Sequence, residues 1–181
     1  MKDRTVVLAV TGGIAAYKSA TLVRELRRAQ AAVFVIMTEH ATEFITPLTM
    51  ETLSQNPVSV GMFEEVKNWD MEHIALADRA DLLLVAPATA NIISKAACGI
   101  ADDLVSTSIL TMMTGTPVLM APAMNTRMWV NPIIKNHVET LKQNGVQFVG
   151  PVDGALAEGT SGMGRMADEQ AIIEAVRGIL G

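Results

Sequence analysis

Short, wholly apolar runs alternate along the chain with longer segments in which apolar positions recur every three or four residues. The apolar runs lack the alternation of a half-exposed strand, so we expect strands that are buried on both faces. The longer segments have helical periodicity, with their charged residues on one side. The predicted strands cover residues 6–10, 33–37, 82–86, 118–121 and 146–149. The predicted helices cover residues 14–29, 72–79, 92–97, 104–113, 132–143 and 169–179.

This order of elements is typical of a parallel sheet with helices on both faces. The sequence therefore predicts one three-layer α/β domain with a doubly wound parallel sheet over residues 1–181. Residues 150–167 differ from the rest, because they are rich in glycine and have no periodicity. We predict a long mobile loop there, and loops of this length are often functional.

Composition and charge exclude several classes of protein. Half of the 181 residues are hydrophobic and 18% are charged, which excludes intrinsic disorder. The net charge of −5 lacks the basic character of a nucleic-acid-binding protein. The one cysteine, Cys98, allows no internal disulfide, and no His, Cys and Asp cluster has the spacing of metal ligands. The start of the chain has no signal-peptide pattern, so we expect a cytoplasmic protein.

One stretch is long enough to cross a bilayer, because no charged residue lies between Asp103 and Arg127. Hydroxyl side chains and the turn at Gly115 interrupt it, together with Pro117 and Pro122. We interpret this stretch as a buried helix, a turn and a buried strand.

Four motifs follow predicted strands, at the sheet edge where doubly wound folds bind ligands. In the first, Gly12 and Gly13 let the backbone approach a ligand, and free N–H groups at the helix start suit a phosphate. The third glycine of the dinucleotide fingerprint is missing. The motif therefore suits a mononucleotide, and a tight turn without any ligand explains it equally well.

The second and third motifs combine hydroxyl groups with small residues. Thr38 follows the second strand, where it can cap the next helix or reach a phosphate. Residues 86–91 surround Thr89 and Asn91 with alanines, which would let a flat ring come close. A helix cap after a proline turn explains this third motif as well.

The fourth motif, residues 121–129, contains Asn125. Its uncharged amide could bind a carboxylate that must later lose CO2, whereas Trp129 is more typical of a core position. His73 begins a short helix, where a single histidine is usually structural or solvated. His40 and His137 lie in ordinary helical patterns and suggest no role.

Taken together, these motifs resemble those of the homo-oligomeric flavin-containing cysteine decarboxylases, and most closely the phosphopantothenoylcysteine decarboxylases. Residues 122–129 match the family pattern P-x-M-N-x-x-M-W in full. Residues 87–91 resemble P-A-S-A-N, with Thr89 in place of serine, and residues 73–77 resemble the segment with the family's active-site histidine. Residues 99–104 resemble a segment near the flavin, and residues 162–166 resemble the end of the substrate clamp.

The resemblance implies a Rossmann-like flavoprotein that binds FMN and decarboxylates 4'-phosphopantothenoylcysteine to 4'-phosphopantetheine. In this scheme the flavin oxidises the thiol, CO2 leaves, and the flavin returns its electrons. The catalytic residues would be His73 as base, Asn125 for the carboxylate, and Glu158. Substrate contacts would also come from Met128 and Arg165. The implied FMN contacts are Gly12, Gly13, Ile14, Thr38, Ala88, Thr89, Ala90, Asn91, Ser106 and Ala121. Relatives form trimers or dodecamers with the flavin at a subunit interface, so a homotrimer or dodecamer is implied here.

One departure from the family pattern lies in the clamp, where residues 157–159 read Ala-Glu-Gly instead of A-C-G. The missing cysteine is assigned to the reductive half of the reaction. Glu158 could replace it as a proton donor if burial raises its pKa. Alternatively the product is an enethiol, as in the peptidyl-cysteine decarboxylases, or the chain is an impaired variant. A solvated loop carboxylate is the simplest alternative for Glu158.

Other classes remain open from the sequence. A flavin prenyltransferase of related fold would want a basic residue for a prenyl phosphate in place of residues 122–129, and that segment is intact. A non-catalytic flavoprotein that regulates a partner is disfavoured by the presence of His73 and Asn125. The ligase domain to which such decarboxylases are often fused is not in this sequence, so we expect either a monofunctional enzyme or an excised domain.

Overall fold

Six parallel strands form the central sheet, in the order β3-β2-β1-β4-β5-β6. The computed structural model describes the backbone of residues 1–61 and 72–181, and the side chains of residues 1–61 and 76–181. The strand order reverses between β1 and β4, which is the switch point of a doubly wound fold. The predicted parallel, doubly wound sheet is therefore confirmed. Its strands are β1 (Thr5–Val10), β2 (Ala32–Met37), β3 (Val58–Ser59), β4 (Leu82–Ala88), β5 (Val118–Pro122) and β6 (Gln147–Phe148).

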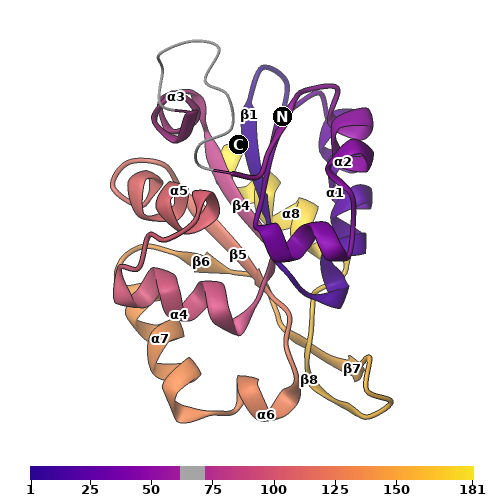
Figure 1. The fold of residues 1–181 in the computed structure, drawn as a ribbon, viewed down its shortest axis with the longest axis vertical. Coiled ribbons are helices and arrows are strands. Elements are labelled where there is room, and N and C mark those ends of the chain that lie inside the picture. Colours follow the sequence, from indigo (N-terminus) through magenta and orange to yellow (C-terminus); the bar gives the residue numbers. More distant parts are fainter. Residues whose placement is uncertain (62–71) are drawn as a thin grey trace.

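Helices cover both faces of this sheet (Figure 1). On one face α1 (Ser19–Arg28), α2 (Pro47–Ser54) and α8 (Glu169–Leu180) pack against the strands, and on the other face lie α3 (Glu72–Arg79), α4 (Ala90–Cys98), α5 (Leu104–Met112) and α7 (Pro132–Gln143). Val6 and Leu8 of β1 point into the first layer, and Val7 and Ala9 point into the second. Both faces are fully buried, which explains why the strand sequences do not alternate.

Several short elements were absent from the sequence prediction. The helix expected over 14–29 begins as a 3-10 helix, η1 (Ile14–Lys18), before α1 starts. A second 3-10 helix, η2 (Glu39–Glu43), follows β2, and α6 (Thr126–Trp129) follows β5. Together with α2 and β3, these segments are too short or too weakly periodic to be recognised from apolar spacing.

Residues 150–167, for which the sequence predicts a long mobile loop, contain secondary structure that the prediction missed. This segment forms an antiparallel pair, β7 (Val152–Ala155) and β8 (Ser161–Arg165), which projects beyond the carboxyl edge of the sheet (Figure 1). Its glycines and exposed positions hide the alternation of a strand. The pair is stabilised by contact with the rest of the chain: β8 lies against α6, and the backbone N–H of Met124 donates to the Gly164 carbonyl at 3.0 Å.

The uncharged stretch between Asp103 and Arg127 forms α5, a turn and β5, as the sequence predicts. Within the described part of the chain, no helix is long and apolar enough to cross a membrane.

Candidate active site

Two cavities adjoin at the carboxyl edge of the sheet and share Ala123 and Met124 in their walls. The first, which we call the strand-end cavity, has a volume of about 790 Å³ and is lined by the segments that follow β1, β2 and β4. The second, which we call the hairpin cavity, has a volume of about 420 Å³ and lies between η1, residues 123–125 and the β7–β8 hairpin. All four predicted motifs contribute to the first cavity, the fourth through Ala123, Met124 and Met128.

The backbone at Gly12 approaches its neighbours so closely that only glycine fits. A Cβ there would lie 2.4 Å from the Cβ of His40 and 2.9 Å from its carbonyl carbon. At Gly13 a Cβ would lie 3.3 Å from Cγ2 of Thr89. The glycines therefore bring the turns after β1, β2 and β4 together around one space.

Thr38 closes the adjacent wall and is 8% exposed. Its Oγ1 accepts a hydrogen bond from the N–H of Ala41 at 3.3 Å, so it caps η2 as one of the two sequence interpretations expects. Thr38 also lines the strand-end cavity, and the same position therefore faces any phosphate that enters it. The capping role and the ligand role do not exclude each other.

The turns after β1 and β4 are joined by hydrogen bonds at the switch point. Thr11 Oγ1 donates to the Pro87 carbonyl at 2.7 Å and accepts from the N–H of Thr89 at 3.3 Å. Thr89 in turn caps α4 by accepting from Ile92 N–H at 3.4 Å. This network fixes Thr89, Ala90 and Asn91 in the cavity wall, and the cap at Thr89 is one of the two sequence interpretations of the third motif.

An ion-paired cluster that the sequence did not indicate lies in the same wall. Lys95 and Asp103 line the strand-end cavity, with the Lys95 ammonium 2.7 Å from Asp103 and 2.6 Å from Asp102. Desolvation lowers the pKa of Lys95, but hydrogen bonds with the two carboxylates outweigh it, and the pKa is raised. Lys95 therefore stays charged. The sequence signal that could have revealed this cluster is a lysine in α4, a helix whose other residues are mostly small or apolar.

The remaining predicted cofactor contacts lie outside this wall. Ser106 is fully buried, and its hydroxyl accepts from Asp103 N–H at 3.0 Å in the capping box of α5. Ala88 and Ala121 are buried in the core, and Gly13 and Ile14 line the hairpin cavity. His40, to which the sequence gave no role, lines the strand-end cavity.

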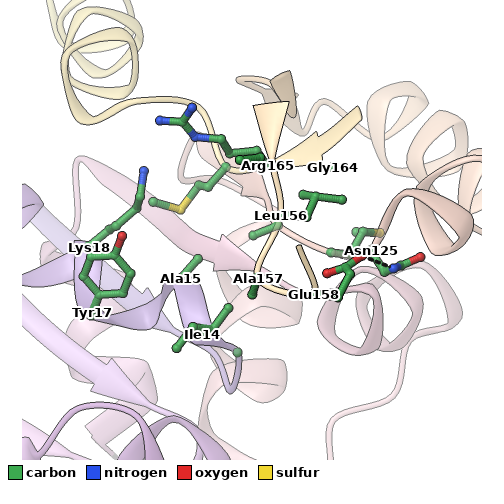
Figure 2. Close-up of a pocket in the computed structure, with 15 residues that line it drawn as sticks. Ile14, Ala15, Tyr17, Lys18, Asn125, Leu156, Ala157, Glu158, Gly164 and Arg165 are labelled. Atoms are coloured by element: carbon green, nitrogen blue, oxygen red, sulfur yellow. Dashed lines mark hydrogen bonds between the residues drawn. The ribbon is translucent and has the colours of Figure 1, made fainter. Parts of the chain in front are cut away.

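Asn125 faces the hairpin cavity with its orientation fixed by the chain. Its Oδ1 accepts the Arg127 N–H at 2.7 Å and so caps α6, which leaves the amide NH2 group free to point away. That NH2 group donates to Oε1 of Glu158, on the loop between β7 and β8 (Figure 2). Thr160 Oγ1 also approaches Glu158, at 3.4 Å. Two of the three residues predicted as catalytic, Asn125 and Glu158, are therefore in direct contact.

The contact depends on how the hairpin docks. A Cβ on Gly164 would lie 2.2 Å from the Met124 carbonyl oxygen, and Gly164 has a φ of +153°. A Cβ on Gly162 would lie 2.5 Å from Thr126 Oγ1. The glycines of β8 therefore allow the hairpin backbone to lie against residues 124–126, which carries Glu158 to Asn125.

The other predicted residues are distributed around these two cavities. Arg165 lines the hairpin cavity, and Met128 lines the strand-end cavity with 47% of its surface exposed. Trp129 packs against the core, as expected, with the Lys135 ammonium 4.1 Å from its ring centre. His73 belongs to α3, which agrees with the predicted short helix, but its side chain lies outside the described residues.

The strand-end cavity fits a flat ring system that carries a phosphate. Gly12 and Thr38 offer close backbone and a hydroxyl to the phosphate, and Ala90, Ile92 and Phe44 offer small or apolar surface to a ring. Among the described residues the hairpin cavity brings a neutral amide and a carboxylate together at its edge. The pair of cavities can therefore hold a ring cofactor next to a carboxylate-bearing substrate.

Comparisons with known proteins identify the family of the chain. A family model for flavoproteins matches residues 1–181. The probable phosphopantothenoylcysteine decarboxylase of Streptococcus mutans is 42% identical over 173 residues, which cover 96% of this chain and 97% of that protein. The coenzyme A biosynthesis bifunctional protein CoaBC of Bacillus subtilis is 44% identical over 174 residues, 96% of this chain. This chain spans only 42% of that protein's length.

Solved structures give the same result. A cysteine-to-serine mutant of PPC decarboxylase, complexed with pantothenoylaminoethenethiol, has a TM-score of 0.84 at 30% identity, covering 98% of this chain and 97% of that one. The FMN binding protein AtHal3 has a TM-score of 0.78 at 30% identity, covering 97% and 96%. The chain therefore belongs to the flavoprotein family, within which its relatives include the phosphopantothenoylcysteine decarboxylases.

Proposed function

We propose that the chain is an FMN-dependent decarboxylase that converts 4'-phosphopantothenoylcysteine to 4'-phosphopantetheine in coenzyme A synthesis. The observation that carries the proposal is the Asn125 amide, which α6 holds with its NH2 group toward the hairpin cavity. That cavity shares a wall with the strand-end cavity, whose glycine turn and hydroxyls suit FMN. The relatives named above support the substrate.

The FMN phosphate would lie against Gly12, Gly13 and Thr38, and the ring against Thr89, Ala90 and Asn91. When bound, FMN supplies a two-electron acceptor for the substrate thiol and a donor for the later reduction. The charged Lys95 cluster stands in the same wall. Of the other predicted contacts, Ile14 lines the neighbouring hairpin cavity. Ala88, Ser106 and Ala121 are buried and would support the wall of the strand-end cavity from the core.

Asn125 would bind the carboxylate that is lost as CO2. A neutral amide orients a carboxylate by hydrogen bonding without the strong charge stabilisation of an arginine. The site therefore does not favour the charged ground state over the transition state, in which the charge leaves the carboxylate. His73 is proposed as the base that takes the thiol proton, since an imidazole titrates near neutral pH.

Glu158 would serve as the proton donor that replaces the family's clamp cysteine. A substrate carboxylate on the Asn125 NH2 group would stand beside the Glu158 carboxylate, because the two groups compete for one amide. Glu158 would therefore stand beside the carbon that loses CO2, where the reductive half of the reaction needs a proton donor.

The product mass tests the proposal. The protein is loaded with FMN and incubated with 4'-phosphopantothenoylcysteine, and the product is measured by mass spectrometry. We expect saturated 4'-phosphopantetheine from the unchanged protein. Glu158→Gln should release a product two hydrogens lighter with the same FMN content, and Glu158→Cys should restore the saturated thiol. Failure of the unchanged protein to release CO2 would overturn the proposal.

A second candidate is oxidative decarboxylation of a peptide that ends in cysteine. It is favoured by Glu158, since the clamp cysteine assigned to the reductive half is absent. In this case the unchanged protein gives a product two hydrogens lighter, and a peptide ending in cysteine is a better substrate than the phosphorylated compound.

We also propose a cytoplasmic homotrimer or dodecamer in which a neighbouring copy completes the flavin site. Ile14, Phe44 and Met128 support this, because each is about half exposed beside one of the cavities. Light scattering of the FMN-loaded protein measures the mass. A monomer that retains full activity would contradict the proposal.

A further inference from the structure

The side of the hairpin cavity away from Asn125 is lined by two cationic side chains. Lys18 and Arg165 lie there with Tyr17, and Asn125 and Glu158 lie on the opposite side (Figure 2). The Lys18 side chain is only 13% exposed. Its ammonium is 3.8 Å from Oε1 of Glu169, which is at the outer limit of an ion pair. Lys18 is therefore a largely buried cation with a loosely placed partner.

Arg165 is exposed to solvent and has, among the described residues, no protein partner for its charge. Within residues 1–61 and 76–181, its guanidinium makes no hydrogen bond or ion pair. Its side chain crosses the hairpin over Gly154, where a Cβ would lie 3.0 Å from Cδ and 3.1 Å from Nη1 of Arg165. The glycine at position 154 thus makes room for Arg165 to lie along the hairpin at the cavity.

We propose that Lys18 and Arg165 bind the phosphate monoester at the distal end of the substrate, with the Tyr17 hydroxyl as a further donor. Glu169 offsets one of the two positive charges, and Glu158 lies on the opposite side, so a net positive charge remains on this side of the cavity for a dianion. A guanidinium presents paired donors that match phosphate oxygens, and an ammonium adds a point charge. This inference rests on the proposed function and assigns the recognition of one part of its substrate.

The arrangement gives the cavity two anchors for one molecule. The amide of Asn125 would hold the carboxylate that is lost, and the cationic side would hold a phosphate that does not react. Binding energy at a remote, unreactive group positions the reacting end of a substrate. A peptide that ends in cysteine offers no such phosphate, so the cationic side selects against it.

The test compares 4'-phosphopantothenoylcysteine with its dephosphorylated form, pantothenoylcysteine, on the FMN-loaded protein. For the unchanged protein we expect kcat/KM to be about 100-fold higher for the phosphorylated substrate, since charge-assisted hydrogen bonds are strong. Arg165→Met and Lys18→Met should each reduce this preference by about tenfold, mainly through KM, and the double variant should bring it near one. The matched control is Arg24→Met, which removes an exposed charge from α1 and should retain the full preference.

Binding gives an independent readout. Calorimetry should show that the unchanged protein binds 4'-phosphopantetheine more tightly than pantetheine. The double variant should bind the two ligands with equal affinity. Inorganic phosphate should compete with 4'-phosphopantetheine and not with pantetheine. Equal use of both substrates by the unchanged protein would overturn the inference and leave the proposed function standing. Decarboxylation of neither substrate would overturn the proposed function itself. Unaltered FMN content in the variants shows that they are folded.

Discussion

The strand-end cavity and the hairpin cavity share two wall residues but are built in different ways. Residues of the strand-end cavity come mainly from turns that follow sheet strands, so the parallel sheet brings them together. The hairpin cavity exists because a separate two-stranded unit docks, backbone to backbone, on residues 124–126. The strand-end cavity is therefore formed by the main fold, and the hairpin cavity is formed by a hairpin that docks onto it.

This difference bears on where the chain departs from the pattern of the family it resembles. In the strand-end motifs the departure is a close one, Thr89 for serine, which keeps the hydroxyl group at the sheet edge. The tip of the hairpin is exposed and meets the rest of the chain through few contacts. The replacement of cysteine by Glu158 is in the hairpin. Chemistry can thus vary at the hairpin while the proposed cofactor site stays fixed.

The largest effect is expected from Gly12→Ala, which changes the turn that lines the strand-end cavity. The new Cβ overlaps His40, including its backbone, and overpacking of this kind costs about 1–3 kcal/mol. We expect FMN binding to weaken by up to about 100-fold, as measured by fluorescence titration. Gly115→Ala is the control, because no atom lies within 4 Å of its added Cβ. Normal FMN affinity in Gly12→Ala would contradict the tight turn.

Gly164→Ala should impair the hairpin cavity and leave the strand-end cavity unchanged. Its Cβ overlaps the Met124 carbonyl and its φ of +153° suits glycine, so the hairpin must move. We expect kcat/KM to fall by about tenfold or more while FMN affinity stays the same. Gly159→Ala has a positive φ but no neighbour within 4 Å of the added Cβ, and it controls for local strain. Parallel loss of FMN would show that the cavities are not independent.

Thr38→Ala tests the proposed phosphate end of the strand-end cavity. Loss of the η2 cap costs about 1 kcal/mol, and loss of the hydroxyl should weaken FMN binding by about tenfold. Thr38→Ser keeps the oxygen and should restore both. Thermal unfolding measures the loss of stability, and FMN titration measures the loss of affinity. Lower stability with unchanged FMN affinity would mean that Thr38 caps η2 and does not bind the phosphate.

The smallest effect is expected from Asp81→Asn, at the opposite edge of the sheet. A hydrogen bond from Thr5 N–H at 2.7 Å, and then Arg4, hold the pKa of Asp81 below its usual value, although desolvation opposes them. A lowered folded-state pKa gives stability that is present above the unfolded pKa and is lost as pH falls through the folded pKa. We expect Asp81→Asn to cost about 1 kcal/mol at pH 7.

Urea unfolding at pH 7 and pH 3 measures this difference, which should shrink at the lower pH. Asp78→Asn, at an exposed position of α3, is the control. FMN affinity and product should not change, because Asp81 lines neither cavity. An equal loss at both pH values would mean that the Asp81 charge does not stabilise the fold.

The longer helices and strands around the main sheet followed from the sequence, because the strands are continuous apolar runs and the helices have one buried face. The apolar runs around Leu8, Leu84 and Leu119 are buried on both faces, and α7 begins and ends at the residues that its pattern predicts. The strand-end residues Gly12, Thr38 and Thr89 were found because a parallel sheet places the segments after its strands at one edge.

What the sequence alone determined is therefore the doubly wound sheet and the segments that follow its strands, since both depend on local pattern. Only the tertiary structure decided that Glu158 contacts Asn125, that Lys95 pairs with two aspartates in the cavity wall, and that Lys18 and Arg165 share one cavity. These relations join residues on different elements. They depend on close backbone approach and on the direction of long side chains, which no periodicity along the chain records.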